Sequence, residues 1–162
     1  MLNEVRKFTL AQLVRGGLIA AVYAVLALAF PEISYGIIQF RLSESLALLP
    51  RIFPEAILGL TVGCFIANLG SPYGLIDILG GTLCTLLASW LTWRLRHHTL
   101  LAMLPPILVN GLGVSAYVAW LSRELYFAVM PLITLSQAVV VICLGFPLYT
   151  FVARRIGAEP RE

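Results

Sequence analysis

Long apolar runs broken by few charges constrain this chain more than any other feature. Of its 162 residues, 60% are apolar and only 12% are charged, and the mean hydropathy is +0.93. Soluble domains contain about 45–50% apolar and about 25% charged residues. A transmembrane helix needs roughly 20 mostly apolar residues in a row, and several runs here approach that length. The sequence therefore predicts an all-α membrane protein.

Charged residues, glycines and prolines interrupt the apolar runs and set the boundaries of the predicted helices. We expect one transmembrane domain over residues 1–162, built as a bundle of six transmembrane helices. The expected helices cover residues 12–30, 41–52, 54–69, 75–93, 100–121 and 125–152. The second is short and charged, so a five-helix arrangement with a re-entrant segment is the alternative.

The placement of arginine and lysine predicts the orientation of the bundle, because cytoplasmic loops of membrane proteins are enriched in both. With six spans, one side of the membrane holds only Arg41 and Arg123. The other side holds Arg6, Lys7, Arg15, Arg51, Arg94, Arg96, Arg154, Arg155 and Arg161. We therefore expect the N- and C-termini to be cytoplasmic.

Several chemistries are excluded by residue types that the sequence lacks. Lys7 is the only lysine and no glycine-rich loop precedes it, so the chain holds no Walker-type ATPase loop. Asp77 is the only aspartate and the cysteines stand singly, so we expect no metal site and no cofactor. His97 and His98 share one polar loop, which argues against a Ser–His enzyme inside the membrane. We expect a protein that is not an enzyme and that binds no nucleic acid.

Charged and amide side chains near the outer face form the first candidate site, because such groups are costly within a membrane and usually serve a function. Arg41 and Glu44 are three residues apart, on one side of a predicted helix. Asn68 ends the third predicted helix and Asp77 begins the fourth. We expect these four residues to converge at one membrane level. Two alternatives stay open: an Arg41–Glu44 ion pair that anchors a helix end, and a capping role for Asp77.

Three further polar residues lie on the fifth and sixth predicted helices. Asn110 and Gln137 are amides within apolar runs, and an amide offers a donor and an acceptor side by side. Tyr117 lies about two turns outward from Asn110 and could line a cavity. The alternative for the two amides is hydrogen bonding between helices, which is common in membrane bundles.

Small residues recur at every fourth position on two predicted helices, a pattern that lets helix backbones approach closely. The sets are Gly16, Ala20 and Ala24 on the first helix, and Gly59, Gly63 and Ala67 on the third. Two partners stay open for the first set: the rest of the bundle, or another protein.

Several stretches resemble the QueT family in their order and spacing, over nearly the whole chain. They are QFRLSESL at 39–46 with Leu49-Pro50, Gly59 with GCFIAN at 63–68, DILGGTL at 77–83, and PPILVN at 105–110. One position departs from the family pattern, because a Gly-Glu pair is expected where this chain has Ser136-Gln137.

The resemblance implies the S component, or substrate-binding subunit, of an energy-coupling factor (ECF) importer in the prokaryotic plasma membrane. Such subunits are six-helix bundles that bind a small molecule from outside and dock on a transmembrane coupling protein with two ATPase subunits. The docking motif would map onto Ala20 and Ala24. The implied substrate is a 7-deazaguanine, chiefly prequeuosine-1, with queuine or queuosine as alternatives. The substrate site would include Arg41, Glu44, Asn68, Asp77, Asn110, Tyr117 and Gln137.

The residue at position 137 leaves the substrate open. A glutamate there would pair with the cationic aminomethyl group of prequeuosine-1, whereas Gln137 can only hydrogen-bond. Two alternatives therefore remain: an S component for another vitamin or purine-like molecule, and a small secondary transporter that works alone.

Overall fold

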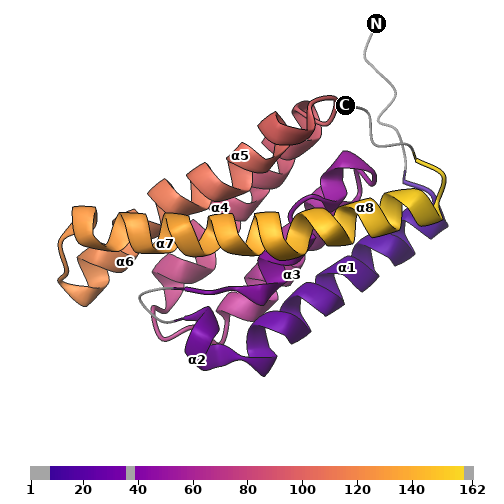
Figure 1. The fold of residues 1–162 in the computed structure, drawn as a ribbon. Helices are drawn as coiled ribbons and strands as arrows, with labels where there is room; N and C mark the ends of the chain where they lie inside the picture. The colour runs from indigo at the N-terminus through magenta and orange to yellow at the C-terminus, as the bar shows by residue number, and fades with distance from the viewer. Residues whose placement is uncertain (1–7, 36–38, 159–162) are drawn as a thin grey trace, which may run out of the picture.

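The structure, a computed structural model, describes residues 8–35 and 39–158 and is helical along most of them. Long helices run side by side along one axis of the bundle (Figure 1). The first half of the chain forms α1 (Leu10–Ala29), the short α2 (Pro31–Ser34), α3 (Ala56–Asn68) and α4 (Leu75–Arg94). Two longer helical stretches follow, each with a π-helical turn inside it: α5 (Thr99–Val109), η3 (Asn110–Val114) and α6 (Ser115–Ser122), then α7 (Tyr126–Val140), η4 (Val141–Gly145) and α8 (Phe146–Arg155).

Local sequence signals explain where the helices begin and end. Thr9 and Gln12 form a capping box at the start of α1, in which the Thr9 backbone N–H donates to Gln12 Oε1 at 2.9 Å. α1 ends just before Pro31, because proline lacks the backbone N–H that would continue that helix. Gly74 precedes α4 with a φ of 64°, a left-handed conformation that glycine adopts without strain.

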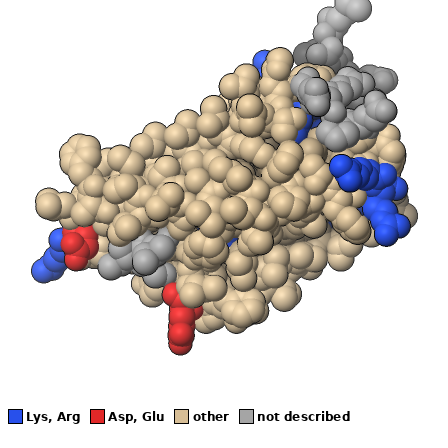
Figure 2. Space-filling view, viewed as in Figure 1, with Lys and Arg blue, Asp and Glu red and all other residues tan. Residues whose placement is uncertain are grey.

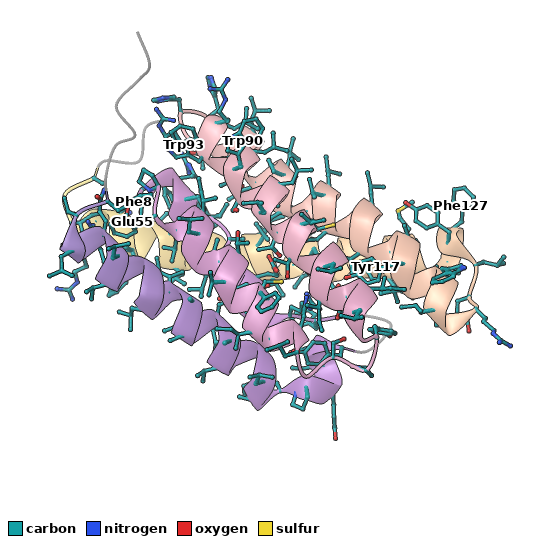
Figure 3. The ribbon with its side chains drawn as sticks, turned by 180° about the vertical axis from the view of Figure 1, so that it is seen from behind. Phe8, Glu55, Trp90, Trp93, Tyr117 and Phe127 are labelled. Atoms are coloured by element: carbon teal, nitrogen blue, oxygen red, sulfur yellow. The ribbon has the colours of Figure 1, made fainter. Side chains whose placement is uncertain are left out.

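Within residues 8–35 and 39–158, four helical stretches are long and apolar enough to cross a membrane: Leu10–Ala29, Leu75–Arg94, Thr99–Ser122 and Tyr126–Arg155. Large apolar side chains cover their outer surfaces, and Trp90, Trp93 and Phe127 lie toward the two ends of the bundle (Figure 3). Aromatic residues are enriched at membrane–water interfaces. The protein is a multi-pass membrane protein. The six-span count and the cytoplasmic position of both termini stay predictions.

The prediction of a transmembrane helix over 41–52 is wrong. The chain forms two short 3₁₀ turns there, η1 (Leu42–Leu46) and η2 (Leu49–Arg51). None of residues 39–53 is exposed. Backbone without regular helical bonding is tolerated at membrane depth only where protein surrounds it, and this burial meets that condition. We call residues 39–52 the buried segment.

The buried segment passes through the middle of the bundle. Near its start, Arg41 contacts Asn68 and Asp77 at one end of α4, and near its finish Arg51 contacts the Arg96 carbonyl beyond the other end. Its leucines join two different cores: Leu46 and Leu49 pack with residues of α1 and α3, and Leu48 packs with residues of α5, η4 and α8. The buried segment therefore holds the two halves of the bundle together.

Charge is distributed unevenly along the bundle. The start of α1 and the end of α8 lie at the same end (Figure 1), and exposed arginines gather there (Figure 2). The opposite end of the same face shows acidic side chains with a basic side chain beside them (Figure 2), and Glu32 of α2 and Glu124 in the loop before α7 are both exposed. Three of the basic residues counted in the sequence, Arg6, Lys7 and Arg161, lie outside the described residues.

The small-residue pattern brings α1 and α3 into close contact. A methyl group on Gly59 would come within 2.6 Å of the Gly16 carbonyl oxygen, and one on Gly63 within 2.8 Å of the Ala20 carbonyl oxygen. Only glycine fits at such crossings. The first set of small residues thus packs within the bundle.

Candidate functional site

Arg41, Asn68, Ser71, Asp77 and Tyr117 form a network that we call the outer polar network, after the membrane side predicted for it. It centres on an ion pair between Arg41 and Asp77. Arg41 Nη2 lies 3.2 Å from Asp77 Oδ2 and donates to Asn68 Oδ1 at 3.1 Å. Tyr117 donates to Asp77 Oδ1 at 2.5 Å, and Ser71 donates to Asp77 Oδ2 at 2.5 Å. Asn68 also donates to the Asp77 backbone carbonyl at 2.8 Å. The predicted convergence of Arg41, Asn68 and Asp77 is therefore present, and Tyr117 joins it.

Neighbouring aromatic residues and backbone groups complete this network. Arg41 Nε donates to the Ser34 carbonyl at 3.2 Å, and its guanidinium lies 5.5 Å from the centre of the Tyr35 ring. Tyr35 donates to the Ala67 carbonyl at 2.5 Å. In the turn between α3 and α4, burial and then the nearby Asp77 carboxylate raise the pKa of Tyr73, which keeps its phenol neutral at physiological pH.

Neither of the two alternatives for these charges, an Arg41–Glu44 ion pair and a capping role for Asp77, is present among the described residues. Arg41 pairs with Asp77, and the ion pairs of the described residues do not include one between Arg41 and Glu44. Gly74, rather than Asp77, stands at the N-cap of α4. Asp77 lies in the first turn of that helix and directs its carboxylate to side chains of other elements.

Glu44 occupies a separate buried position on η1. Its Oε1 accepts a hydrogen bond of 2.6 Å from Tyr23 of α1, and the Asn110 side chain lies within hydrogen-bonding reach of the same carboxylate. Only 2% of Glu44 is exposed, and among the described residues no arginine or histidine forms an ion pair with it. A buried carboxylate without a cationic partner is costly, so this position favours a ligand that brings a positive charge or several donors.

Four other buried polar atoms, on the buried segment, η3 and α7, have no hydrogen-bond partner. They are Gln39 Nε2, Ser43 Oγ, Asn110 Oδ1 and Gln137 Oε1, on residues that are each at most 3% exposed. The Gln39 carbonyl accepts a hydrogen bond from Ser136, beside Gln137, and α7 contacts both η1 and η3. Buried polar groups are normally paired, and each exception needs an explanation. These atoms and Glu44 form what we call the inner polar cluster.

The described conformation leaves little free space beside Glu44. A small cavity with Tyr23, Glu44 and Thr85 among its lining residues has a volume of about 10 Å³. That is the space of about one water. A larger ligand would enter the inner polar cluster only if the surrounding elements moved apart.

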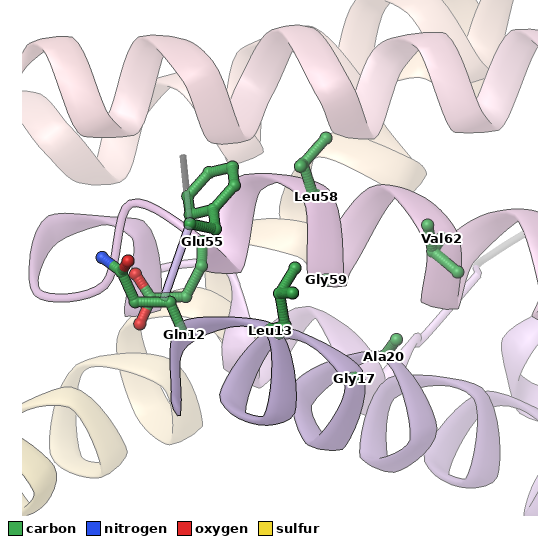
Figure 4. Close-up of a pocket in the computed structure, with 10 residues that line it drawn as sticks. Gln12, Leu13, Gly17, Ala20, Glu55, Leu58, Gly59 and Val62 are labelled. Atoms are coloured by element: carbon green, nitrogen blue, oxygen red, sulfur yellow. The ribbon is translucent and has the colours of Figure 1, made fainter. Parts of the chain in front are cut away.

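The two alanines of the expected docking motif are buried in this conformation. Ala20 and Ala24 are each 7% exposed. Ala20 lies along an apolar groove of about 160 Å³ between α1 and α3, with Leu13 and Val62 among its walls (Figure 4). Both side chains are therefore largely covered in this conformation, although the groove beside Ala20 is open.

A model of the family described as "QueT transporter" matches residues 13–154. The chain belongs to the QueT transporter family. The resemblance predicted from the motifs is confirmed, and the expectation that the chain is not an enzyme agrees with a family of transporters.

One curated relative of this QueT family member is the "Queuosine precursor transporter QueT" of Lactococcus lactis subsp. cremoris (strain MG1363). The two are 38% identical over 71 residues, which is 43% of this chain and 41% of the relative. The match thus spans less than half of the relative's length. No solved structure matches the chain.

Within this QueT family member, the structure divides the seven predicted site residues into two neighbouring groups. Arg41, Asn68, Asp77 and Tyr117 bond to one another, whereas Glu44, Asn110 and Gln137 lie in the inner polar cluster. Sequence reasoning missed Tyr23, Gln39 and Ser43. Gln39 and Ser43 flank Arg41 and Glu44 in a motif already singled out, so their position was an available signal. Nothing in the sequence distinguishes Tyr23 from an interfacial tyrosine.

Proposed function

We propose that this chain is the S component of an ECF importer, which captures a queuosine precursor from outside and delivers it with partner ATPases. Membership in the QueT transporter family and the name of the curated relative support this proposal. The observation that carries it is Glu44: a buried carboxylate without an ion-pair partner among the described residues, next to unpaired amide and hydroxyl groups.

The inner polar cluster suits the chemistry of prequeuosine-1. This ligand has an aminomethyl cation, N–H donors on its deazaguanine ring and one ring carbonyl acceptor. Glu44 would bind the cation or the donor edge, while Asn110 Oδ1 and Gln137 Oε1 accept further N–H groups. Gln39 Nε2 would donate to the ring carbonyl. Gln39 Nε2, Asn110 Oδ1 and Gln137 Oε1 thereby each acquire a partner of the opposite kind.

The outer polar network would close the site rather than contact the ligand. Arg41, Asn68, Asp77 and Tyr117 already use one another's donors and acceptors. We propose that this network holds the start of the buried segment against α3, α4 and α6. These residues would then affect ligand affinity indirectly, because Arg41 lies three residues before Glu44 and helps to position it.

Binding to the purified protein tests the ligand and the site together. We expect prequeuosine-1 to bind, and Glu44→Gln to weaken it at least tenfold, because losing a charge-assisted hydrogen bond removes about 1.5–3 kcal/mol. The matched control is Glu124→Gln, which neutralises an exposed glutamate in the loop before α7. Equal affinities for Glu44→Gln and Glu124→Gln would remove Glu44 from the site.

Gln137 favours one alternative, an S component for a different purine-like molecule or vitamin. If prequeuosine-1 is the substrate, Gln137→Glu adds a second carboxylate near the cation and should tighten its binding. Competition among prequeuosine-1, queuine, queuosine, other purines, pterins and vitamins separates the candidates. A ligand outside the queuosine precursors that displaces all of them would replace the substrate in this proposal.

The need for ATPase partners requires a separate experiment. Uptake should occur only when the chain is expressed together with the transmembrane coupling protein and two ATPases. The groove beside Ala20 is the proposed docking position, and Gly17→Leu would fill it from α1 while leaving ligand binding intact. Uptake in a host that lacks the coupling proteins would instead identify a secondary transporter.

A further inference from the structure

Arg51 is a buried cation at the opposite end of the bundle from Asp77. It is 8% exposed and is held by neutral groups: Nε and Nη2 donate to the Arg96 carbonyl at 3.2 and 3.1 Å, and Nη2 donates to Thr99 Oγ1 at 2.9 Å. The guanidinium also lies 4.4 Å from the centre of the Tyr149 ring. Its remaining nitrogen, Nη1, is buried and has no hydrogen-bond partner.

This cation lacks a counter-charge within the described part of the chain. The ion pairs there join Arg41 to Asp77 and Arg15 to Glu55, and neither includes Arg51. An arginine keeps its charge in proteins, and a buried charge is costly unless an opposite charge and hydrogen bonds compensate it. Arg51 is therefore preorganised for an anion that this part of the chain does not supply.

The surroundings of Arg51 provide space and further positive charge. A hollow of about 550 Å³ is lined by Arg51, Ile52, Arg96, His97, Tyr149, Gly157 and Ala158. Its volume falls in the range of about 300–1,000 Å³ that is typical of small-molecule pockets. None of these lining residues is acidic. Arg96 is itself fixed, because it donates to the Trp93 carbonyl at 3.1 Å and lies 4.7 Å from the centre of the Trp93 ring.

We propose that this hollow binds a phosphate group, with Arg51 Nη1 as the buried donor and Arg96 and His97 at its rim. Arginine suits phosphate because its planar fork donates several N–H groups to the oxygens of one anion. The hollow lies at the end of the bundle that carries most of the arginines, where anionic lipid headgroups of a cytoplasmic leaflet would also gather. The phosphate therefore comes either from a lipid headgroup or from a soluble phosphorylated molecule.

Thermal unfolding of the full chain tests the site with two probes. In detergent, inorganic phosphate is compared with chloride at matched ionic strength. In nanodiscs, phosphatidylglycerol is compared with phosphatidylcholine. A free ligand concentration of about ten times its Kd should raise the midpoint of thermal unfolding by about 3–6 °C for a chain of this size. A shift with phosphate assigns a soluble anion, and a shift with phosphatidylglycerol alone assigns a lipid headgroup.

Charge-removing variants locate the effect. Arg51→Gln should abolish the shift, and Arg96→Gln, which keeps the backbone carbonyl that Arg51 uses, should raise the Kd severalfold. The second variant keeps the test decisive if the first does not fold. Arg94→Gln is the matched control, since Arg94 lies at the same end of α4 over the Trp90 ring but outside the hollow. The proposal is overturned if neither probe exceeds its reference, or if Arg94→Gln and Arg96→Gln lower the affinity equally.

Discussion

Replacing Gly63 by alanine should weaken the packing of α1 on α3. The added methyl group would lie 2.8 Å from the Ala20 carbonyl oxygen and 2.8 Å from Tyr23 Cβ. Both atoms belong to or adjoin the α1 backbone, so rotating a flexible side chain cannot relieve the clash. The two helices would have to move apart, and Tyr23 would move away from Glu44.

The size of the effect follows from these distances. Carbon atoms prefer separations of about 3.5–4.0 Å, and a local gap of about 0.5–1 Å already loses a quarter to a half of each neighbouring contact. Overpacking of a tight core costs about 1–3 kcal/mol. The better helix propensity of alanine offsets at most about 1 kcal/mol of this cost. We expect Gly63→Ala to lower the free energy of unfolding by about 1–2 kcal/mol.

Gly17→Ala is the matched control, because it makes the same chemical change on α1 at a position where an added methyl group meets nothing within 4 Å. This control should be neutral or slightly stabilising. Thermal unfolding of both variants in one detergent measures the difference, at about 2–4 °C for each kcal/mol. If Gly63→Ala unfolds at the same temperature as Gly17→Ala, α1 and α3 are not in close contact and the reasoning fails.

Three further substitutions test the buried polar groups and the buried segment. Asp77→Asn removes the counter-charge of Arg41 and should cost about 3–5 kcal/mol of stability, measured by thermal unfolding. Tyr23→Phe removes the 2.6 Å hydrogen bond to Glu44 and should cost about 1.5–3 kcal/mol, with weaker ligand binding in the same sample. Leu48→Ala truncates a side chain that is 0% exposed and leaves a cavity, which should cost about 2–5 kcal/mol of stability, measured by thermal unfolding.

Each of these changes has a control of the same chemistry. Glu32→Gln neutralises an exposed acid, Tyr126→Phe removes a hydroxyl with only a 3.4 Å contact, and Leu10→Ala trims a side chain that is 78% exposed. All three should change the midpoint by little. A core variant that is as stable as its control would show that the corresponding contact does not stabilise the bundle.

Hydropathy predicted the long helices well, because lipid-facing helices must be apolar over a length set by the membrane. The helix predicted at 41–52 rested on the distribution of arginine and lysine rather than on hydropathy, and the structure has two 3₁₀ turns there, where the apolar residues mark burial in protein and not a helical period. Pro50 and Pro54 lack the N–H groups that a continuous α-helix would use, and they were available as a warning. Whether such a segment forms a helix depends on the elements that surround it in the folded bundle, and a single sequence does not give their positions.

The candidate site was predicted in part for a similar reason. Charges are so rare in this chain that Arg41 and Asp77 stood out, and their convergence, although not their pairing, was predicted from helix ends that meet at one level. The choice between Asp77 and Glu44 as the partner of Arg41 depends on side-chain packing within the bundle, which the spacing of residues does not encode. Tyr23 could not be predicted as a site residue for the same reason, because its contact with Glu44 depends on the close approach of α1 and α3.

The buried segment also constrains how this protein is made. A helix can leave the translocation machinery and enter lipid alone, because its backbone groups bond to one another. Residues 39–52 cannot, because their 3₁₀ turns leave part of the backbone without regular helical bonds, and α1, α3, α4, α7 and α8 contact these turns in the folded bundle. The segment must therefore stay in a protein or aqueous environment until the later helices have been synthesised. Membrane insertion and tertiary folding of this chain are thus one coupled event, and truncation before α8 should leave the segment without a stable place in the membrane.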